Sequence, residues 1–183
     1  MKPRLSTSAR RAGPMVLAAW LSVGCVAARA ADALVGDLEQ RLAQSGADAV
    51  NTHLVAQWSQ AMVPLNQKTA ACELHAVSLS VRLARSHNTR AVAAHDEALR
   101  AATGQCVRFV LAMAAPAEVP RYCGSVSTWG PAQTARELRR RIGDIEGDAL
   151  LRASRLGQAC RAAYVYELEH TRVVVRRTAP GAK

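Results

Sequence analysis

Two apolar stripes run through residues 69–113, which read TAACELHAVSLSVRLARSHNTRAVAAHDEALRAATGQCVRFVLAM. Within each stripe the spacing alternates between three and four residues, which places the side chains on one face of a helix. The stripe members are Thr69, Cys72, Ala76, Leu79, Leu83 and Ser86, then Val92, His95, Leu99, Ala102, Cys106, Phe109 and Met113. The stretch therefore predicts two helices that each bury one face.

A turn at residues 86–89 would fold these helices into an antiparallel hairpin. In one register the numbers of facing residues always sum to 178, so that every stripe residue meets another. The facing pairs are Ser86 with Val92, Leu83 with His95, Leu79 with Leu99, Ala76 with Ala102, and Cys72 with Cys106. Because this register sets two cysteines opposite each other, it predicts a Cys72–Cys106 disulfide.

A second hairpin is expected after residue 130. Pro131 suits the first turn of a helix that carries Leu138 and Ile145, and Gly147 ends it. Asp148 is the predicted cap of a longer helix that carries Cys160 and Tyr164. Cys123 precedes the shorter helix near the level of Cys160, so we predict Cys123–Cys160 as the second disulfide. Residues 172–177 contain three consecutive valines and fit either an extension of the last helix or a short strand.

Upstream of residue 69, we expect a short helix over Asp32–Gln44 and another that follows Ser45 or Asp48 as its cap. The second helix carries an apolar stripe of Val50, Leu54, Trp58 and Met62. The predicted fold is an all-α, small helical bundle of five or six helices, built from two antiparallel hairpins that are joined by two disulfides. We expect one domain over residues 31–178 and a disordered tail over residues 179–183.

Residues 1–30 have the pattern of a secretory signal peptide. A basic stretch ends at Arg11, an apolar run covers Met15–Val26, and Ala28-Arg29-Ala30 is a small-residue exit. The apolar run is shorter than the ~20 residues of a membrane span, and no later segment is long and uncharged enough. We therefore expect a periplasmic protein that begins at Ala31 and has no transmembrane segment.

Two other interpretations of the signal fit less well. Cys25 could carry a lipid, although Ser22 stands where an aliphatic residue is expected. A twin-arginine signal would need bulky apolar residues after Arg11, where Ala12-Gly13-Pro14 follows. Removal of residues 1–30 leaves four cysteines, an even number that suits two disulfides in an oxidising compartment.

The net charge does not indicate a nucleic-acid-binding protein. The whole chain carries +10, but residues 1–30 hold five basic residues and no acidic one, so the remaining 19 basic and 14 acidic residues give +5. On the helix after Pro131, Glu137 stands four residues before Arg141, and Arg140 four before Asp144. That spacing predicts a solvated, self-paired surface. A nucleic acid would also be a partner in the wrong compartment.

No enzyme motif is present. The sequence has no Gly-x-Ser-x-Gly turn, phosphate-binding glycine loop or paired His-x-x-x-His. Cys72 and His75 are three residues apart, as metal ligands sometimes are, but a disulfide would remove the cysteine as a ligand. His95 is expected to pack beside Leu83. We predict a binding protein without a cofactor or metal, and keep as the alternative a small periplasmic enzyme or metal-handling protein that uses His75 and His95.

The segment over residues 115–131 differs in kind from the helices, because it holds two of the few aromatic residues next to Cys123. Rigid aromatic side chains bind partners at low entropic cost, so a long loop held by a disulfide is a candidate contact surface. Together with the arginine-rich helix that follows, it supplies the predicted partner-binding residues, which are Tyr122, Trp129, Arg136, Arg139 and Arg140. The other interpretation is that Tyr122 and Trp129 only close one end of the bundle.

These features predict a protein-binding module whose partner is another protein in the periplasm. Helical proteins with paired cysteines in bacterial periplasms include inhibitors of lysozyme-like enzymes and immunity proteins against toxins that degrade the cell wall. The chain is similar to them in type, through its signal pattern and cysteines, and shares no specific motif with them. The resemblance implies an inhibitor or immunity protein against a cell-wall-degrading enzyme or toxin.

Overall fold

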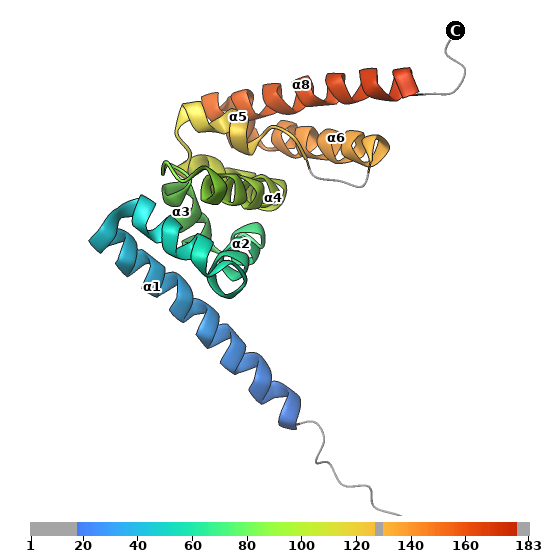
Figure 1. Cartoon of the computed structure of the whole chain (residues 1–183). Coiled ribbons are helices and arrows are strands. Elements are labelled where there is room, and N and C mark those ends of the chain that lie inside the picture. The colour runs from blue at the N-terminus through green and yellow to red at the C-terminus, as the bar shows by residue number, and fades with distance from the viewer. Residues whose placement is uncertain (1–17, 127–129, 179–183) are drawn as a thin grey trace, which may run out of the picture. The chain divides into compact units, whose positions relative to one another are not determined.

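The computed structural model describes the backbone of residues 18–126 and 130–178, and the side chains of residues 33–126 and 130–171. Every regular element in these ranges is a helix (Figure 1). The elements are α1 (Ala18–Ala56), the π-helix η1 (Trp58–Met62), α2 (Val63–Ala70), α3 (Leu74–Leu83), α4 (Thr89–Met113), the 3-10 helix η2 (Pro116–Glu118), α5 (Val119–Tyr122), α6 (Pro131–Gly147), α7 (Ala149–Ala153) and α8 (Arg155–Thr178).

The predicted all-α bundle with two disulfides is confirmed. The described ranges hold eight α-helices, more than the five or six predicted, because turns divide predicted helices and a short helix forms where a loop was expected. Residues 172–177 belong to α8, so the helical alternative for this stretch is the observed one. The tail over residues 179–183 and the basic start of the predicted signal lie outside the described residues.

By its internal contacts the chain separates into two compact units, Met1–Ala33 and Leu34–Lys183, and the packing reported below lies in the second. A glycine at a positive φ interrupts α1: Gly46 has φ 78° and ψ 171°, a region that glycine adopts without steric penalty. This break falls where the sequence predicted one. The side chain of Asp48 accepts a hydrogen bond from the His87 backbone amide, 2.7 Å away, and so contacts the turn before α4.

The first predicted hairpin is present, but its first helix is shorter than the apolar stripe suggested. The stripe from Thr69 to Ser86 crosses a turn at residues 71–73, which separates α2 from α3. At this turn Cys72 has φ 64°, and it is the one non-glycine residue with a positive φ in the described ranges. Cys72 forms the predicted disulfide with Cys106, at a Cα–Cα distance of 6.2 Å. The predicted first helix of the hairpin is therefore interrupted at Cys72, one of the two cysteines from which the disulfide was predicted.

The second hairpin contains one turn that the sequence analysis missed. Asp148 caps α7 as predicted, because its side chain accepts hydrogen bonds from the amides of Leu150 and Leu151. Ser154 then ends α7 and caps α8, accepting from the Gly157 amide at 2.9 Å. The Cys123–Cys160 disulfide is present as predicted, with a Cα–Cα distance of 5.1 Å.

The core consists of three groups of buried side chains. The first joins α1, η1, α2, α3 and the start of α4, and includes Leu38, Leu54 and Leu79. The second joins the end of α4 to α5, α6, α7 and α8, with Cys123 and Cys160 inside it. The third lies between α3, α4 and α5. Leucine is the commonest buried residue, with alanine next. The two disulfides would each stabilise the fold by about 2–4 kcal/mol.

Within the described residues, no helix combines the length and the apolar character that a membrane crossing requires.

Candidate functional site

Helix α6 presents the arginines that the sequence analysis named as partner-binding residues. Pro131 occupies its first turn, and Ala135, Leu138 and Ile145 are buried against the core. With the partly buried Ile142 they recur every three or four positions, so the side chains on the opposite side of the helix face solvent. Arg136, Arg139 and Arg140 are all exposed, and we call them the arginine face of α6.

Two arginines of α6 bond to the backbone of α4. Arg140 Nη2 donates to the Gly104 carbonyl oxygen at 2.9 Å, and Arg141 Nη1 donates to the Arg100 carbonyl oxygen at 2.8 Å. Arg141 is buried and also lies 3.3 Å from the Tyr164 hydroxyl. Arg140 and Arg141 therefore attach α6 to α4, and Arg140 is the member of the arginine face with an evident structural role.

The carboxylate of Glu137 bonds to both Arg140 and Arg141. Glu137 accepts hydrogen bonds from Arg140 Nη2 at 2.6 Å and from Arg141 Nε at 2.8 Å, and Arg140 also pairs with Asp144 at 2.7 Å. The i,i+4 pairs predicted from the sequence are thus confirmed. The hydrogen bonds from Arg140, and then from Arg141, lower the pKa of Glu137 to about 2.

We expect Glu137→Gln to destabilise the protein, because it leaves the buried Arg141 without its carboxylate. The Arg141 side chain is 9% exposed and that of Glu137 27%, so solvent screening reduces the effect to about 1–2 kcal/mol in urea unfolding. Asp144→Asn is the matched control. Its side chain is 50% exposed, and we expect a loss below about 0.5 kcal/mol. Equal losses in the two variants would contradict the role assigned to Arg141.

Arg136 and Arg139 differ from Arg140 in their surroundings. Neither has a hydrogen-bond or ion-pair partner among the described residues, and both project from a helix whose opposite face is fixed in the core. They contribute positive charge that the fold itself does not use. Of the five predicted partner-binding residues, these two best meet the requirements of a contact surface.

Tyr122 is not part of that surface, which corrects the sequence-based assignment. Its side chain is 0% exposed and belongs to the core group between α3, α4 and α5. Burial raises the pKa of its hydroxyl to about 12, and its backbone carbonyl accepts a hydrogen bond from Thr103 Oγ1 at 2.8 Å. The interpretation that Tyr122 closes the bundle is the correct one. Trp129, the other predicted aromatic anchor, lies outside the described residues.

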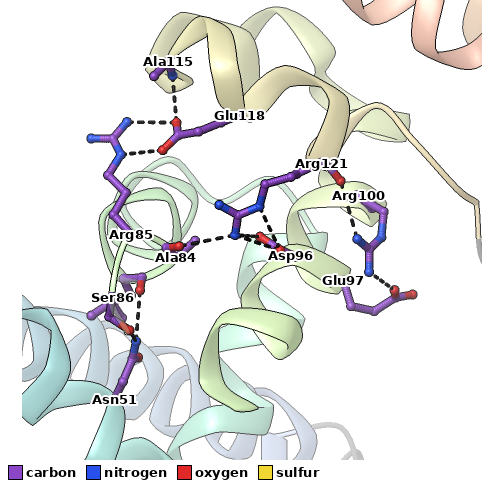
Figure 2. A network of polar contacts seen from close by, with 11 residues as sticks. Asn51, Ala84, Arg85, Ser86, Asp96, Glu97, Arg100, Ala115, Glu118 and Arg121 are labelled. Carbon is purple, nitrogen blue, oxygen red and sulfur yellow. Dashed lines mark hydrogen bonds and ion pairs between the residues drawn. The ribbon is translucent and has the colours of Figure 1, made fainter. Parts of the chain in front are cut away.

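The first part of the expected contact loop is folded against the α3–α4 hairpin. Residues 116–122 form η2 and α5, and Figure 2 shows how two arginine–carboxylate pairs hold them. Glu118 accepts from Arg85 at 2.7 and 3.0 Å and from the Ala115 amide at 2.7 Å. Desolvation raises the pKa of Glu118, but the hydrogen bonds from Arg85 and Ala115 outweigh it, so the pKa lies below its ordinary value.

The second pair runs from α5 to α4. Arg121 Nη2 lies 2.7 and 2.8 Å from the two carboxylate oxygens of Asp96, and it also donates to the Ala84 carbonyl oxygen at 3.3 Å (Figure 2). The side chain of Asp96 is 14% exposed. A partner that needed these groups would have to break bonds inside the fold, so this part of the segment serves the bundle.

The two histidines of the alternative function occupy different environments. The His75 side chain is 78% exposed, with Nδ1 3.7 Å from Glu39 Oε1. His95 is fully buried, as expected for a neighbour of Leu83, and its Nε2 lies 2.9 Å from Asn51 Oδ1. In the part of the chain that the structure describes, no group of three or more His, Cys, Asp or Glu side chains is placed to hold a metal ion.

A cavity of about 460 Å³ that the sequence analysis did not anticipate opens beside α6. Residues 103–109 of α4 form one wall, and the remaining lining residues come from α6, α7 and α8: Arg140, Arg141, Asp144, Asp148, Leu151 and Tyr164. Its charged groups are paired, since Arg108 bonds to Asp148, Arg140 to Asp144, and Arg141 to Glu137 outside the lining. The sequence held one signal of a close approach at this place, which is the isolated glycine Gly104 within a helical pattern. Its lack of a side chain lets the Arg141 guanidinium approach the α4 backbone.

Comparison of the chain with protein-family models, with curated proteins and with solved structures finds no match.

Proposed function

We propose that this protein is an exported, periplasmic protein-binding module whose partner contacts the arginine face of α6 through acidic side chains. The observation that carries the proposal is that Arg136 and Arg139 are exposed, adjacent on one helix face and unpaired among the described residues. Inhibitors and immunity proteins against cell-wall-degrading enzymes or toxins act by such binding, and we propose this class for the chain.

Two physical arguments support the arginine face over other surfaces. The guanidinium group offers several N–H donors in a fixed plane, which suits bidentate contacts with carboxylates. The backbone that carries Arg136 and Arg139 is also held rigid, because Arg140 and Arg141 bond to α4 and Leu138 is buried. A rigid helix loses little entropy on binding.

Export is supported by the cysteines. Cys72, Cys106, Cys123 and Cys160 are all oxidised to disulfides, and disulfides persist in oxidising compartments. This agrees with the signal pattern of residues 1–30.

We expect the double variant Arg136→Glu/Arg139→Glu to lose the partner. The tagged protein would be purified from the periplasm, its bound partner identified by mass spectrometry, and the dissociation constant of the isolated pair measured. Reversal of two charges facing carboxylates should weaken binding at least about tenfold, with much of the change in the association rate and a strong dependence on salt.

Arg82 on α3 supplies the control, because it is exposed and its side chain has no ion-pair or hydrogen-bond partner among the described residues. Arg82→Glu alters the charge in the same direction at a different surface, and we expect binding to change by less than about twofold. If Arg82→Glu and the α6 variants weakened binding equally, the net charge rather than the arginine face would be responsible, and the proposed surface would be wrong.

We expect the mature chain to begin at Ala31. The protein would be released from the periplasm by osmotic shock and its amino-terminal peptide sequenced by mass spectrometry. A peptide that starts at Ala31 in this fraction supports export through the signal of residues 1–30. A chain that keeps Met1 in the cytoplasmic fraction, or one that starts at a lipid-modified Cys25, would contradict the prediction.

A further inference from the structure

The two disulfides differ in their exposure to solvent. Cys123 and Cys160 are both 0% exposed and lie within the core group that joins α5 to α8. Cys72 and Cys106 are both partly exposed, and Cys106 lines the cavity beside α6. Because exchange requires a thiolate to reach a sulfur atom, access favours reaction at the Cys72–Cys106 disulfide.

The backbone at this disulfide is also unlike the rest of the bundle. Cys72 has φ 64°, a conformation that a side chain with a Cβ atom adopts at a cost. Cys106 has φ −143° and ψ 54°, which are not helical values, although it lies in the middle of α4. The disulfide therefore joins two positions at which the helical backbone is interrupted.

The distortion at Cys106 shapes the cavity. Residues 103–109 form one wall of it, with Cys106 at their centre. On the amino-terminal side of Cys106, Arg140 and Arg141 bind the carbonyl oxygens of Gly104 and Arg100. A regular helix through Cys106 would shift the following residues, including Arg108, relative to α6. The backbone conformation at Cys106 therefore contributes to the geometry of the cavity.

We propose that the Cys72–Cys106 disulfide is a reversible thiol–disulfide exchange site that reacts with a dithiol, and that its reduction lets α4 become regular at Cys106 and reshapes the cavity. The Cys123–Cys160 disulfide stays oxidised and keeps the second hairpin folded. The inference does not depend on the proposed function.

The exchange takes two steps. A thiolate of the dithiol attacks Cys106 Sγ, a mixed disulfide forms, and the Cys72–Cys106 bond breaks with its electron pair on Cys72. The second thiolate of the dithiol then attacks the first sulfur of the dithiol, which is bonded to Cys106 in the mixed disulfide, and Cys106 leaves as a thiolate. The dithiol is oxidised to a cyclic disulfide, and the two cysteines take up two electrons and two protons. Cys72 Sγ lies 3.3 Å from the Ala102 carbonyl oxygen, to which the new thiol can donate.

Reduction at this site leaves other contacts between α3 and α4 in place. Leu79 and Leu83 of α3 and Ala102 of α4 are buried, as are Val77, Leu99 and Val110 in the third core group. The ion pair between Arg121 and Asp96 also remains. Cys72 and Cys106 pack against the edge of this group. We expect its buried members to stay in contact when the disulfide opens, and the response to be confined to α4 and the cavity.

The experiment is a graded reduction of the purified protein with both disulfides formed. Samples are exposed to increasing dithiothreitol, alkylated with iodoacetamide and mapped by mass spectrometry. We expect Cys72 and Cys106 to be labelled at least about tenfold faster than Cys123 and Cys160. Hydrogen exchange on the partly reduced form should change within residues 103–110 and remain unaltered within the helix interior at residues 138–145.

Cys72→Ser/Cys106→Ser provides a permanently open form, with Cys123→Ser/Cys160→Ser as the matched control. The first variant should keep its helical circular dichroism and reproduce the exchange pattern of the partly reduced protein. Three results would overturn the proposal. These are equal or faster labelling of Cys123 and Cys160, an unchanged exchange pattern over residues 103–110 after selective reduction, and loss of the fold in the first variant.

Discussion

Gly157→Ala is expected to destabilise the protein by on the order of 4 kcal/mol, the largest effect of a single methyl group that we predict for this chain. A Cβ atom at Gly157 would overlap the Leu151 carbonyl oxygen and lie 2.8 Å from Ser154 Oγ. The carbonyl belongs to the backbone of α7 and cannot rotate away. The chain would have to open the turn between α7 and α8, and with it the hydrogen bond from the Gly157 amide to Ser154. Urea unfolding followed by circular dichroism measures the loss.

Gly143→Ala is the control for helix propensity. Nothing lies within 4 Å of a Cβ atom at Gly143, which is an exposed position inside α6. Alanine is a better helix former than glycine, so this variant should be more stable than the wild type by about 0.5–1 kcal/mol. A Gly157→Ala protein of wild-type stability would show that α7 and α8 meet at a different angle from the one described.

The same turn shows why part of the fold could not be predicted from the sequence. Asp148 was predicted as a cap from the preceding Gly147 and the apolar residues that follow, and it caps α7. The second break, at Ser154, has no proline and no sustained gap in the apolar pattern, and a serine in a helix is common on an exposed face. Whether such a serine ends a helix depends on contacts made in three dimensions.

Disulfide pairing was the most successful prediction because it depended on geometry that the pattern contains. The spacing of Leu79, Leu83, His95 and Leu99 defines how two helices face each other, and only one register sets Cys72 opposite Cys106. The error was local. The stripe continued through Cys72 although the helix did not, because Thr69 and Ala76 are buried on either side of the turn at residues 71–73.

The candidate site was predicted in part. Arg136, Arg139 and Arg140 were expected on an exposed helix face, which the regular apolar spacing of α6 defines, and they lie there. Tyr122 was placed on the same surface because a segment rich in proline and glycine has no periodicity from which to infer burial. Its helix, α5, covers only Val119–Tyr122, too short for a pattern to define a buried side.

Protonation of His95 is expected to remove about 3 kcal/mol of stability as the pH falls from neutral to about 4. His95 is fully buried, and desolvation lowers its pKa from 6.5 to about 4. The contact with Asn51 defines the tautomer of the neutral His95 ring. Its amide nitrogen donates to the Leu83 carbonyl oxygen at 2.9 Å, so its oxygen faces His95 and accepts from Nε2. The neutral ring therefore leaves Nδ1 unprotonated, and that atom is buried without a hydrogen-bond partner.

The sign follows from the two pKa values. Between pH 6.5 and 4 the unfolded chain binds a proton at His95 that the folded chain does not, so the free energy of unfolding decreases as the pH falls. Above pH 6.5 this histidine contributes no pH dependence. Glu137, whose pKa is lowered from 4.5 to about 2, changes the free energy of unfolding at lower pH, below its ordinary pKa of 4.5. The two groups can therefore be distinguished by pH.

Urea unfolding at a series of pH values tests this, with His95→Gln as the decisive variant. Glutamine has an amide that can donate to Asn51 and does not titrate, so the loss of stability between pH 6.5 and about 4.5 should shrink by about 2–3 kcal/mol in this protein. His75→Gln is the control, because His75 is 78% exposed, and it should keep the wild-type slope. An unchanged slope in His95→Gln would mean that other groups cause the acid sensitivity, and that burial does not keep the His95 ring neutral.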